Sequence, residues 1–100
     1  MSSGHLIAAD EFCIQNNIEL SFIILLHENG LIEITTVEET KFIPEECLAE
    51  LEKMIRFHYE LDINLEGIEA ITHLLHRVEI LQEELRGLKN RLQFYEHNKL

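Results

Sequence analysis

The sequence predicts a mainly α-helical protein with a small two-stranded β hairpin and one long C-terminal helix. Three patterns predict this class: an apolar heptad repeat near the C-terminus, an amphipathic helical pattern before it, and a short alternating stretch earlier in the chain. Apolar residues recur about every 3.6 positions on a helix face and every second position on a strand face. One hundred residues, 46% of them hydrophobic, suffice for one small domain. We expect that domain over residues 1–64 and a helical extension over residues 65–100.

The heptad repeat extends from Ile71 to Tyr95, and its apolar residues alternate in steps of three and four. Such a repeat keeps one narrow seam of a helix facing a neighbouring helix. The stretch is roughly 40 Å long as a helix, longer than a body of this size covers. We therefore expect self-association, most simply a dimer, while coverage by the same chain and the direction of the second helix stay open. The predicted self-association seam consists of Ile71, Leu74, Val78, Leu81, Leu85, Leu88, Leu92 and Tyr95.

The net charge is −11, and its distribution along the chain is uneven. Residues 1–40 contain seven Asp and Glu and no Lys or Arg. Phosphate backbones are bound chiefly through Lys and Arg, so this half is not expected to bind nucleic acid by itself. A cationic protein surface is the partner that its charge favours. No apolar run is long enough to span a membrane and no signal peptide begins the chain, so a cytosolic protein with reduced cysteines is expected.

The N-terminal half predicts one short strand and two helices. Residues 5–8 are apolar and fit a small strand, and residues 10–16 begin with acids, as the first turn of a helix often does. Residues 18–30 are so uniformly apolar that a buried strand and a buried helix both fit the pattern. Their ending, Glu-Asn-Gly, is typical of a helix that stops at a left-handed glycine, so a helix is favoured with Gly30 after its end.

The alternating residues of 31–37 and 40–43 predict a hairpin with Glu38 and Glu39 at its tip. Pro44 suits the first turn of the following amphipathic helix, expected from Pro44 to about Leu61 with His58 partly buried on its apolar face. Asn64 is a good N-cap for the last helix. That helix either continues unbroken into the heptads or bends near residues 73–77.

Signatures of catalysis and of cofactor binding are missing from the sequence. The four glycines are too widely spaced for a phosphate-binding loop, and no serine has a base near it in sequence. His73 and His76 share a helix face but lack a third ligand nearby, so no metal site is predicted. We expect neither enzymatic activity nor a cofactor.

The order of elements resembles that of MerR-type winged helix-turn-helix proteins, in which the hairpin is the wing. Within that group the sequence is similar to the CbpM family of chaperone modulators over nearly its whole length. The resemblance rests on Glu11-Phe12-Cys13, Gly30-Leu31-Ile32, Phe42, Arg56, Leu61-Asp62-Ile63-Asn64, Gly67 and the leucine repeat. It implies a MerR-like winged helix-turn-helix fold with a small two-stranded wing and a long C-terminal heptad helix, and it supports the helix over residues 20–29.

The resemblance also implies a partner and an activity. Members of the CbpM family bind the J-domain of the DnaJ-like co-chaperone CbpA and inhibit it, and a J-domain presents a basic helix to the DnaK chaperone. Where DNA-binding MerR proteins typically carry Arg-Tyr-Tyr-Glu, this chain has Leu25-Leu26-His27-Glu28, without the arginine. A DNA-binding MerR-like dimer is the alternative function. Charge and helix spacing nominate Glu79, Glu83 and Glu84 as partner-binding residues, and then Glu60, Asp62 and Glu66.

Overall fold

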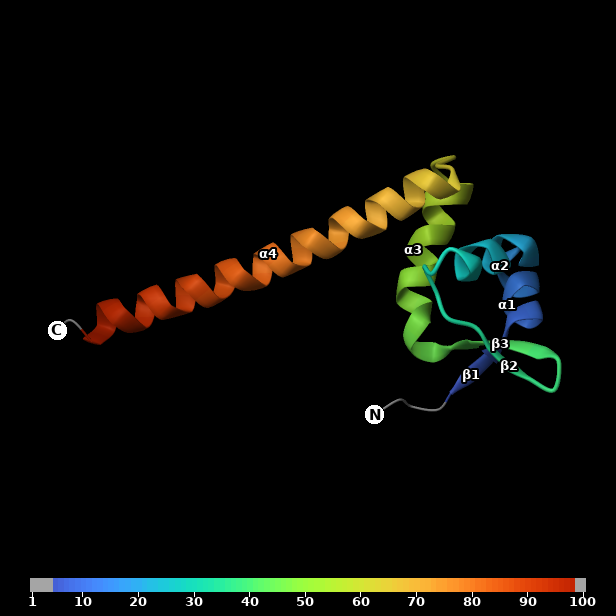
Figure 1. Cartoon of the computed structure of the whole chain (residues 1–100), viewed down its shortest axis with the longest axis horizontal. Coiled ribbons are helices and arrows are strands. Elements are labelled where there is room, and N and C mark those ends of the chain that lie inside the picture. The colour runs from blue at the N-terminus through green and yellow to red at the C-terminus, as the bar shows by residue number, and fades with distance from the viewer. Residues whose placement is uncertain (1–4, 99–100) are drawn as a thin grey trace. The chain divides into compact units, whose positions relative to one another are not determined.

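The computed structural model describes residues 5–98 and the side chains of residues 5–97. It divides into two compact units, Met1–Leu65 and Glu66–Leu100, which are treated separately below. The first unit contains three strands, three α-helices and a short 3-10 helix, and the second is formed by one long helix (Figure 1). The predicted class, a mainly α-helical winged helix-turn-helix with a small β wing and a long C-terminal helix, is confirmed.

The small sheet has three antiparallel strands in the order β1-β3-β2. The strands are β1 (Leu6–Ala8), β2 (Thr35–Val37) and β3 (Thr40–Pro44). The hairpin β2–β3 is the predicted one, but β2 begins at Thr35 and not at Leu31 because Ile32 turns into the core and is buried. The third strand, β1, pairs with β3 in a register that places Ile7 opposite Ile43.

The tip of the wing consists of two residues with left-handed backbone. Glu38 has a φ of 49° and Glu39 a φ of 67°. A two-residue connection with positive φ at both positions matches the right-handed twist of the strands it joins. The wing therefore ends in two exposed carboxylates.

Two short helices, α1 (Ala9–Asn16) and α2 (Leu20–Glu28), follow β1 and form the helix-turn-helix pair (Figure 1). Asn17 ends α1 with a φ of 58° and donates its backbone N–H to the carbonyls of Cys13 and Ile14. Gly30, with a φ of 76°, follows α2. The predicted helix over residues 20–29 and its left-handed glycine are confirmed, so the uniformly apolar stretch is not a strand.

The next helix, α3, spans Leu48–Tyr59 and is preceded by the 3-10 helix η1 (Glu45–Cys47). Pro44 is therefore not in the first turn of α3, as the sequence predicted, but is the last residue of β3. Proline fits there because its fixed φ also suits extended backbone. Beyond α3 the chain turns through Asp62, whose φ is 59°.

The core of the first unit is formed by side chains from both helix-turn-helix helices, the following loop, β3 and α3. No buried residue in the described part of the chain is polar or charged. Burial of these apolar groups contributes most of the stability of such a small unit. The buried residues are Ala9, Phe12, Cys13, Phe22, Ile23, Leu26, Ile32, Ile43, Pro44, Leu51 and Met54.

The last helix, α4, spans Leu65–Asn98 as one helix. The question whether the chain breaks near residues 73–77 is thereby answered, because the helical assignment is continuous through them. Every side chain of residues 73–97 is exposed. A single helix cannot cover its own apolar residues, so the heptad side chains of this unit are open to a second helix.

Candidate functional site

The helix-turn-helix pair and the wing present a surface almost without cations. Lys41 is the only Lys or Arg among the described residues 5–44. The outward side of α2 presents Ser21, Leu25, His27 and Glu28, all of them exposed. DNA-binding proteins place Lys, Arg and other donors on phosphate oxygens to fix their register on the duplex. This surface offers acids and apolar groups in their place.

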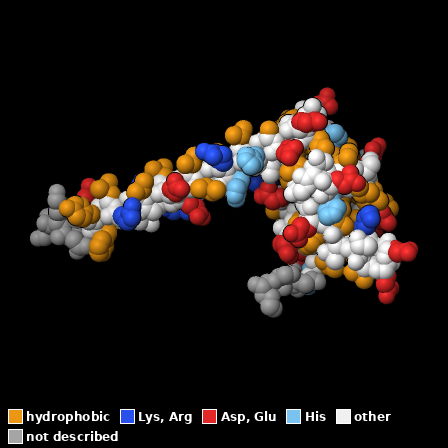
Figure 2. All heavy atoms as spheres, viewed as in Figure 1, with side chains coloured by type: hydrophobic (Ala, Val, Ile, Leu, Met, Phe, Trp, Pro, Cys, Tyr) orange, Lys and Arg blue, Asp and Glu red, His pale blue; other side chains and the backbone are white. Residues whose placement is uncertain are grey.

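The negative charge of the chain is concentrated in the first unit. Residues 1–65 contain 13 Asp and Glu against three Lys and Arg, whereas residues 66–100 contain six against five. Figure 2 shows one face, on which Asp and Glu side chains are spread over the first unit. The charge of −10 on this unit favours encounters with basic partners and opposes encounters with phosphate backbones.

An aromatic cluster fixes the N-terminal end of α2 against the C-terminal end of α3. The rings of Phe22 and His58 are stacked with centroids 4.5 Å apart, and Tyr59 meets both rings edge-on. The backbone N–H of Glu19 donates to Tyr59 Oη at 3.1 Å. His58 Nδ1 lies 3.1 Å from the carbonyl oxygen of Ile63. His58 is half-buried in this packing, as the sequence predicted.

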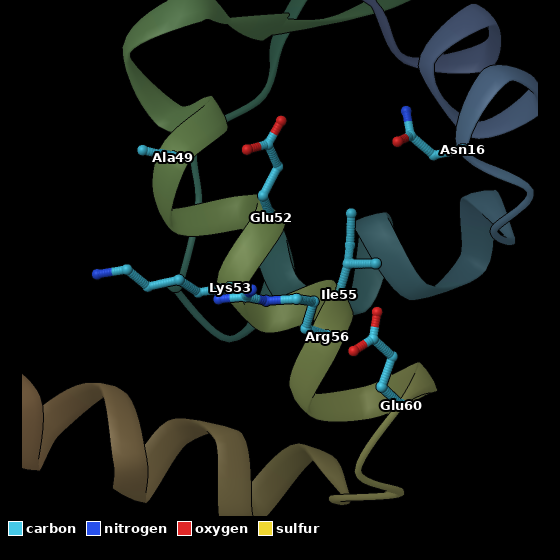
Figure 3. A pocket seen from close by; sticks show the side chains of 7 residues that line it. All are labelled: Asn16, Ala49, Glu52, Lys53, Ile55, Arg56 and Glu60. Carbon is cyan, nitrogen blue, oxygen red and sulfur yellow. The ribbon is translucent and has the colours of Figure 1, made fainter.

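The cluster holds α3 so that its other side borders an open groove of about 560 Å³. The groove lies between α3 and the C-terminal end of α1 (Figure 3). We name it the α1–α3 groove, and its lining residues are Asn16, Ala49, Glu52, Lys53, Ile55, Arg56 and Glu60.

Two carboxylates and one aliphatic side chain from the chain segment around α3 face Asn16 across the α1–α3 groove. Figure 3 shows Glu52, Ile55 and Glu60 on the side of α3 that faces Asn16, while Lys53 extends to the opposite side. Lys53 Nζ lies 3.7 Å from a carboxylate oxygen of Glu50. The groove thus combines an apolar centre with carboxylates at both ends, an arrangement suited to a segment carrying both apolar and cationic groups.

A comparison with protein families decides the broad class of the chain. The sequence pattern of the MerR HTH family of regulatory proteins matches residues 7–90, which include the helix-turn-helix pair, the wing, α3 and most of α4. The chain belongs to the MerR HTH family of regulatory proteins. No curated protein and no solved structure matches it.

The long helix of this MerR-family chain carries a continuous apolar seam. Its exposed members have between 43% and 65% of their surface exposed, with Val78 the least and Tyr95 the most exposed. Ile71, at the beginning of the seam, is half-buried. Three further large exposed apolar residues of α4 lie outside the predicted seam: Leu75, and Ile80 and Phe94 at the heptad position of Gly87.

The nominated acids of this MerR-family chain fall into three places. Glu79 and Glu83 lie on the polar side of α4, where Glu79 is within 4.0 Å of His76 Nδ1. Glu84 borders a shallow hollow that is also lined by Gly87, Leu88 and Arg91. Glu60 and Asp62 lie at the end of α3 and in the turn that follows it.

Glu60 lines the α1–α3 groove, whereas Asp62 is exposed in a left-handed turn. Glu66 lies in the first turn of α4 and is also exposed. An acid in that turn favours the positive end of the helix. The nominated carboxylates therefore do not form one cluster, and Glu60 alone joins the groove.

Apart from Glu60, sequence reasoning nominated none of the groove residues, Asn16, Glu52 and Ile55 among them. The spacing of Glu52, Arg56 and Glu60, four residues apart along one helix side, was available as a signal. The participation of Asn16 was not, because it depends on how α1 packs beside α3.

Groups able to perform other chemistry are sparse in the described residues. They contain no cluster of three or more His, Cys, Asp or Glu that could hold a metal ion. Burial, followed by the nearby Asp10 carboxylate, raises the pKa of the Cys13 thiol and keeps it protonated. Both cysteines are free thiols. Within residues 5–98, no helix is apolar over a length that would cross a membrane.

Proposed function

We propose that this MerR-family chain is a non-enzymatic regulator of the CbpM type. In this proposal it binds the J-domain of a CbpA- or DnaJ-like co-chaperone and inhibits it by competing with the DnaK chaperone. The observation that carries the proposal is a winged helix-turn-helix surface with Lys41 as the only Lys or Arg among residues 5–44. A MerR-type scaffold with a single cation there has few of the groups that bind phosphate, so a protein partner is favoured.

The charge of the first unit supports a basic protein surface as that partner. Thirteen acids against three basic residues produce a field that accelerates encounters with a cationic helix and orients it. A J-domain uses its basic helix to engage DnaK. A regulator that covers this helix would therefore exclude DnaK by occupying the same surface.

The proposed regulator acts as a homodimer joined by the seam of α4. Seven of the eight predicted seam residues are exposed, from Leu74 through Tyr95. Packing them against a second copy would remove a continuous apolar stripe from water. Dimerisation would also present two acidic units to the partner.

The experiment that tests the function uses two measurements on the purified chain. Isothermal titration with the J-domain of a CbpA-like co-chaperone measures binding, and the ATPase of DnaK stimulated by that J-domain measures inhibition. We expect saturable binding and a loss of the J-domain-dependent part of the ATPase. The basal ATPase of DnaK alone should stay unchanged. Absence of binding, or inhibition of the basal rate, would contradict the proposal.

A MerR-like transcriptional regulator that binds DNA as a coiled-coil dimer is the second candidate. The family match over residues 7–90 favours it, because it includes the complete helix-turn-helix pair and wing. An electrophoretic shift of promoter DNA at moderate salt distinguishes the two functions. On the first proposal, the chain alone leaves the DNA unshifted at concentrations that saturate the J-domain.

A further inference from the structure

We propose that the α1–α3 groove is the docking site for one amphipathic helix whose Lys or Arg side chains flank an aliphatic residue. This inference deepens the proposed function, on which it rests, by naming where the basic helix of the partner is held. The groove belongs entirely to the first unit, at residues 16 and 49–60. The groove is therefore formed without any residue of the seam on α4.

Three groups at the edge of the groove can accept hydrogen bonds from a bound segment: the carboxylates of Glu52 and Glu60 and the side-chain oxygen of Asn16. Among the described residues, neither Glu52 nor Glu60 has an ion-pair partner within 4 Å. Asn16 Nδ2 donates to the carbonyl oxygen of Phe12 at 2.9 Å, which leaves Asn16 Oδ1 as an acceptor. A rim of acceptors selects an occupant rich in donors, and cationic donors form the stronger hydrogen bonds with carboxylates.

The two basic residues of the lining form no ion pair within 4 Å with these carboxylates. Lys53 is directed to the other side of α3, where it lies 3.7 Å from Glu50 (Figure 3). Arg56 lies one turn from both Glu52 and Glu60, yet it forms no ion pair within 4 Å with either of them. Both carboxylates are exposed and open to cations from outside.

The centre of the groove is apolar and fits an aliphatic side chain. Ile55 is half-buried between the two acidic ends, and Ala49 adds a small methyl group to the lining. Contacts of this kind supply affinity, while the flanking charges fix the orientation of the bound segment. A volume of about 560 Å³ admits a few side chains and not a whole helix, so the occupant lies across the opening.

The spacing of the carboxylates sets the spacing of the cations that they accept. Glu52 on α3 and Glu60, the residue that caps its C-terminal end, are eight positions apart, which corresponds to about 12 Å along the helix axis. A helix lying beside α3 matches this separation when two of its Lys or Arg residues are seven or eight positions apart. An aliphatic residue three or four positions after the first cation then faces Ile55.

The test compares a charge reversal in the groove with one elsewhere on the same unit. The groove variant carries Glu52→Lys and Glu60→Lys. The control carries Glu28→Lys and Glu33→Lys, which change the net charge by the same amount at exposed positions outside the groove. The probes are the J-domain of a CbpA-like co-chaperone and a synthetic helical peptide with Lys at positions i and i+7 and Leu at i+3 and i+4.

We expect the groove variant to bind both probes at least tenfold more weakly than the wild type, and the control less than threefold more weakly. Circular dichroism establishes that each variant keeps its helical content. As a second readout that requires no substitution, NMR titration of the wild type should shift the Asn16 side-chain amide and the Ile55 methyl signals. Equal losses of affinity in both variants, with the Asn16 and Ile55 signals unshifted, would show that the groove is not the docking site.

The outcomes separate this inference from the proposed function. If the wild type binds the J-domain but the groove variant binds it equally well, the groove is not the docking site, and the proposed function is still supported. If the wild type does not bind the J-domain but binds the peptide with shifts at Asn16 and Ile55, the groove is a docking site and the proposed function is wrong. Failure to bind either probe contradicts both.

Discussion

The backbone N–H of Glu19 and the Tyr59 hydroxyl, 40 positions apart in the sequence, form a hydrogen bond of 3.1 Å. It joins the residue before α2 to the last residue of α3, beside the stacked rings of Phe22 and His58. The bond is exposed, so water competes for both groups. It nevertheless fixes the helix-turn-helix pair to the helix that carries the groove.

Replacing Tyr59 by Phe tests the contribution of this hydrogen bond. Tyr59→Phe keeps the ring against Phe22 and His58 and removes only the hydroxyl, so we expect a loss of about 0.5–1 kcal/mol in the free energy of unfolding. Tyr59→Ala also removes the edge contacts and should cost about 2 kcal/mol. Urea denaturation followed by circular dichroism measures both. Equal stability of the Phe and Ala variants would show that the ring contacts contribute nothing.

The two faces of α2 differ in burial, and neighbouring leucines test the difference. Leu26 is completely buried, whereas Leu25 is 44% exposed. We expect Leu26→Ala to destabilise the protein by about 2–4 kcal/mol, because it leaves a cavity in the core. Leu25→Ala on the same helix should cost less than about 1 kcal/mol. The midpoints of thermal unfolding compare the two, and a larger effect at Leu25 would contradict the observed orientation of α2.

The parts of the fold that the sequence predicted well are those with a strong local pattern. The heptads of α4 and the amphipathic residues of α3 repeat over many turns, so their periodicity identified both helices. The end of α2 was readable because Gly30 takes the left-handed conformation that glycine adopts at low cost.

The parts that sequence reasoning missed depend on contacts between distant residues. β1 pairs with β3 through Ile7 and Ile43, which are 36 positions apart, and no local pattern reports that pairing. The beginning of β2 was misplaced because Ile32 continues the alternation in sequence but packs into the core after the turn. The groove was missed for the same reason, since Asn16 meets α3 only in the folded unit.

The Cys13 thiol makes stability depend on pH in the alkaline range. Its pKa is raised above the ordinary value of 9.0 by burial and then by Asp10, so the folded state holds the proton more tightly than the unfolded chain. The thiol therefore contributes full stability below pH 9 and loses that contribution as the pH rises through its folded-state pKa. We expect the stability of the wild type to fall above pH 9 more steeply than that of Cys13→Ala.

Cys47 provides the control for this pH dependence. Its thiol is half-buried and it lies in η1, outside the core around α1. We expect Cys47→Ala to keep the alkaline slope of the wild type in urea denaturation at pH 8, 9 and 10. A parallel decline in all three proteins would show that the Cys13 thiol is not responsible.

Self-association through the seam predicts a change of mass when charges enter it. We expect the wild type to have twice the monomer mass of 11.8 kDa in light scattering, and Leu85→Glu with Leu88→Glu to be monomeric. Burying two carboxylates per helix in an apolar interface is unfavourable. Asn90→Glu with Gln93→Glu adds the same charge on the polar side and should leave the dimer intact. A monomeric wild type would show that no second copy occupies the seam.

The acids on the polar side of α4 predict an effect on the rate of encounter more than on the lifetime of the complex. Glu79 and Glu83 are exposed on the polar side of α4, so they would attract a basic J-domain through their charge more than hold it. We expect Glu79→Lys with Glu83→Lys to lower the association rate about threefold to tenfold at low salt and to change the dissociation rate little. Stopped-flow fluorescence at several salt concentrations measures both rates.

Two comparisons make that last prediction specific. Glu79→Gln with Glu83→Gln changes the net charge by half as much as the two Lys substitutions do. This variant should have an intermediate association rate. At about 0.5 M salt, screening shortens the range of these charges to a few Å, so all three proteins should associate at similar rates. The groove pair Glu52 and Glu60 flanks Ile55, and its reversal should instead raise the dissociation rate. Association rates that ignore both salt and the charge at Glu79 and Glu83 would exclude these two residues from steering.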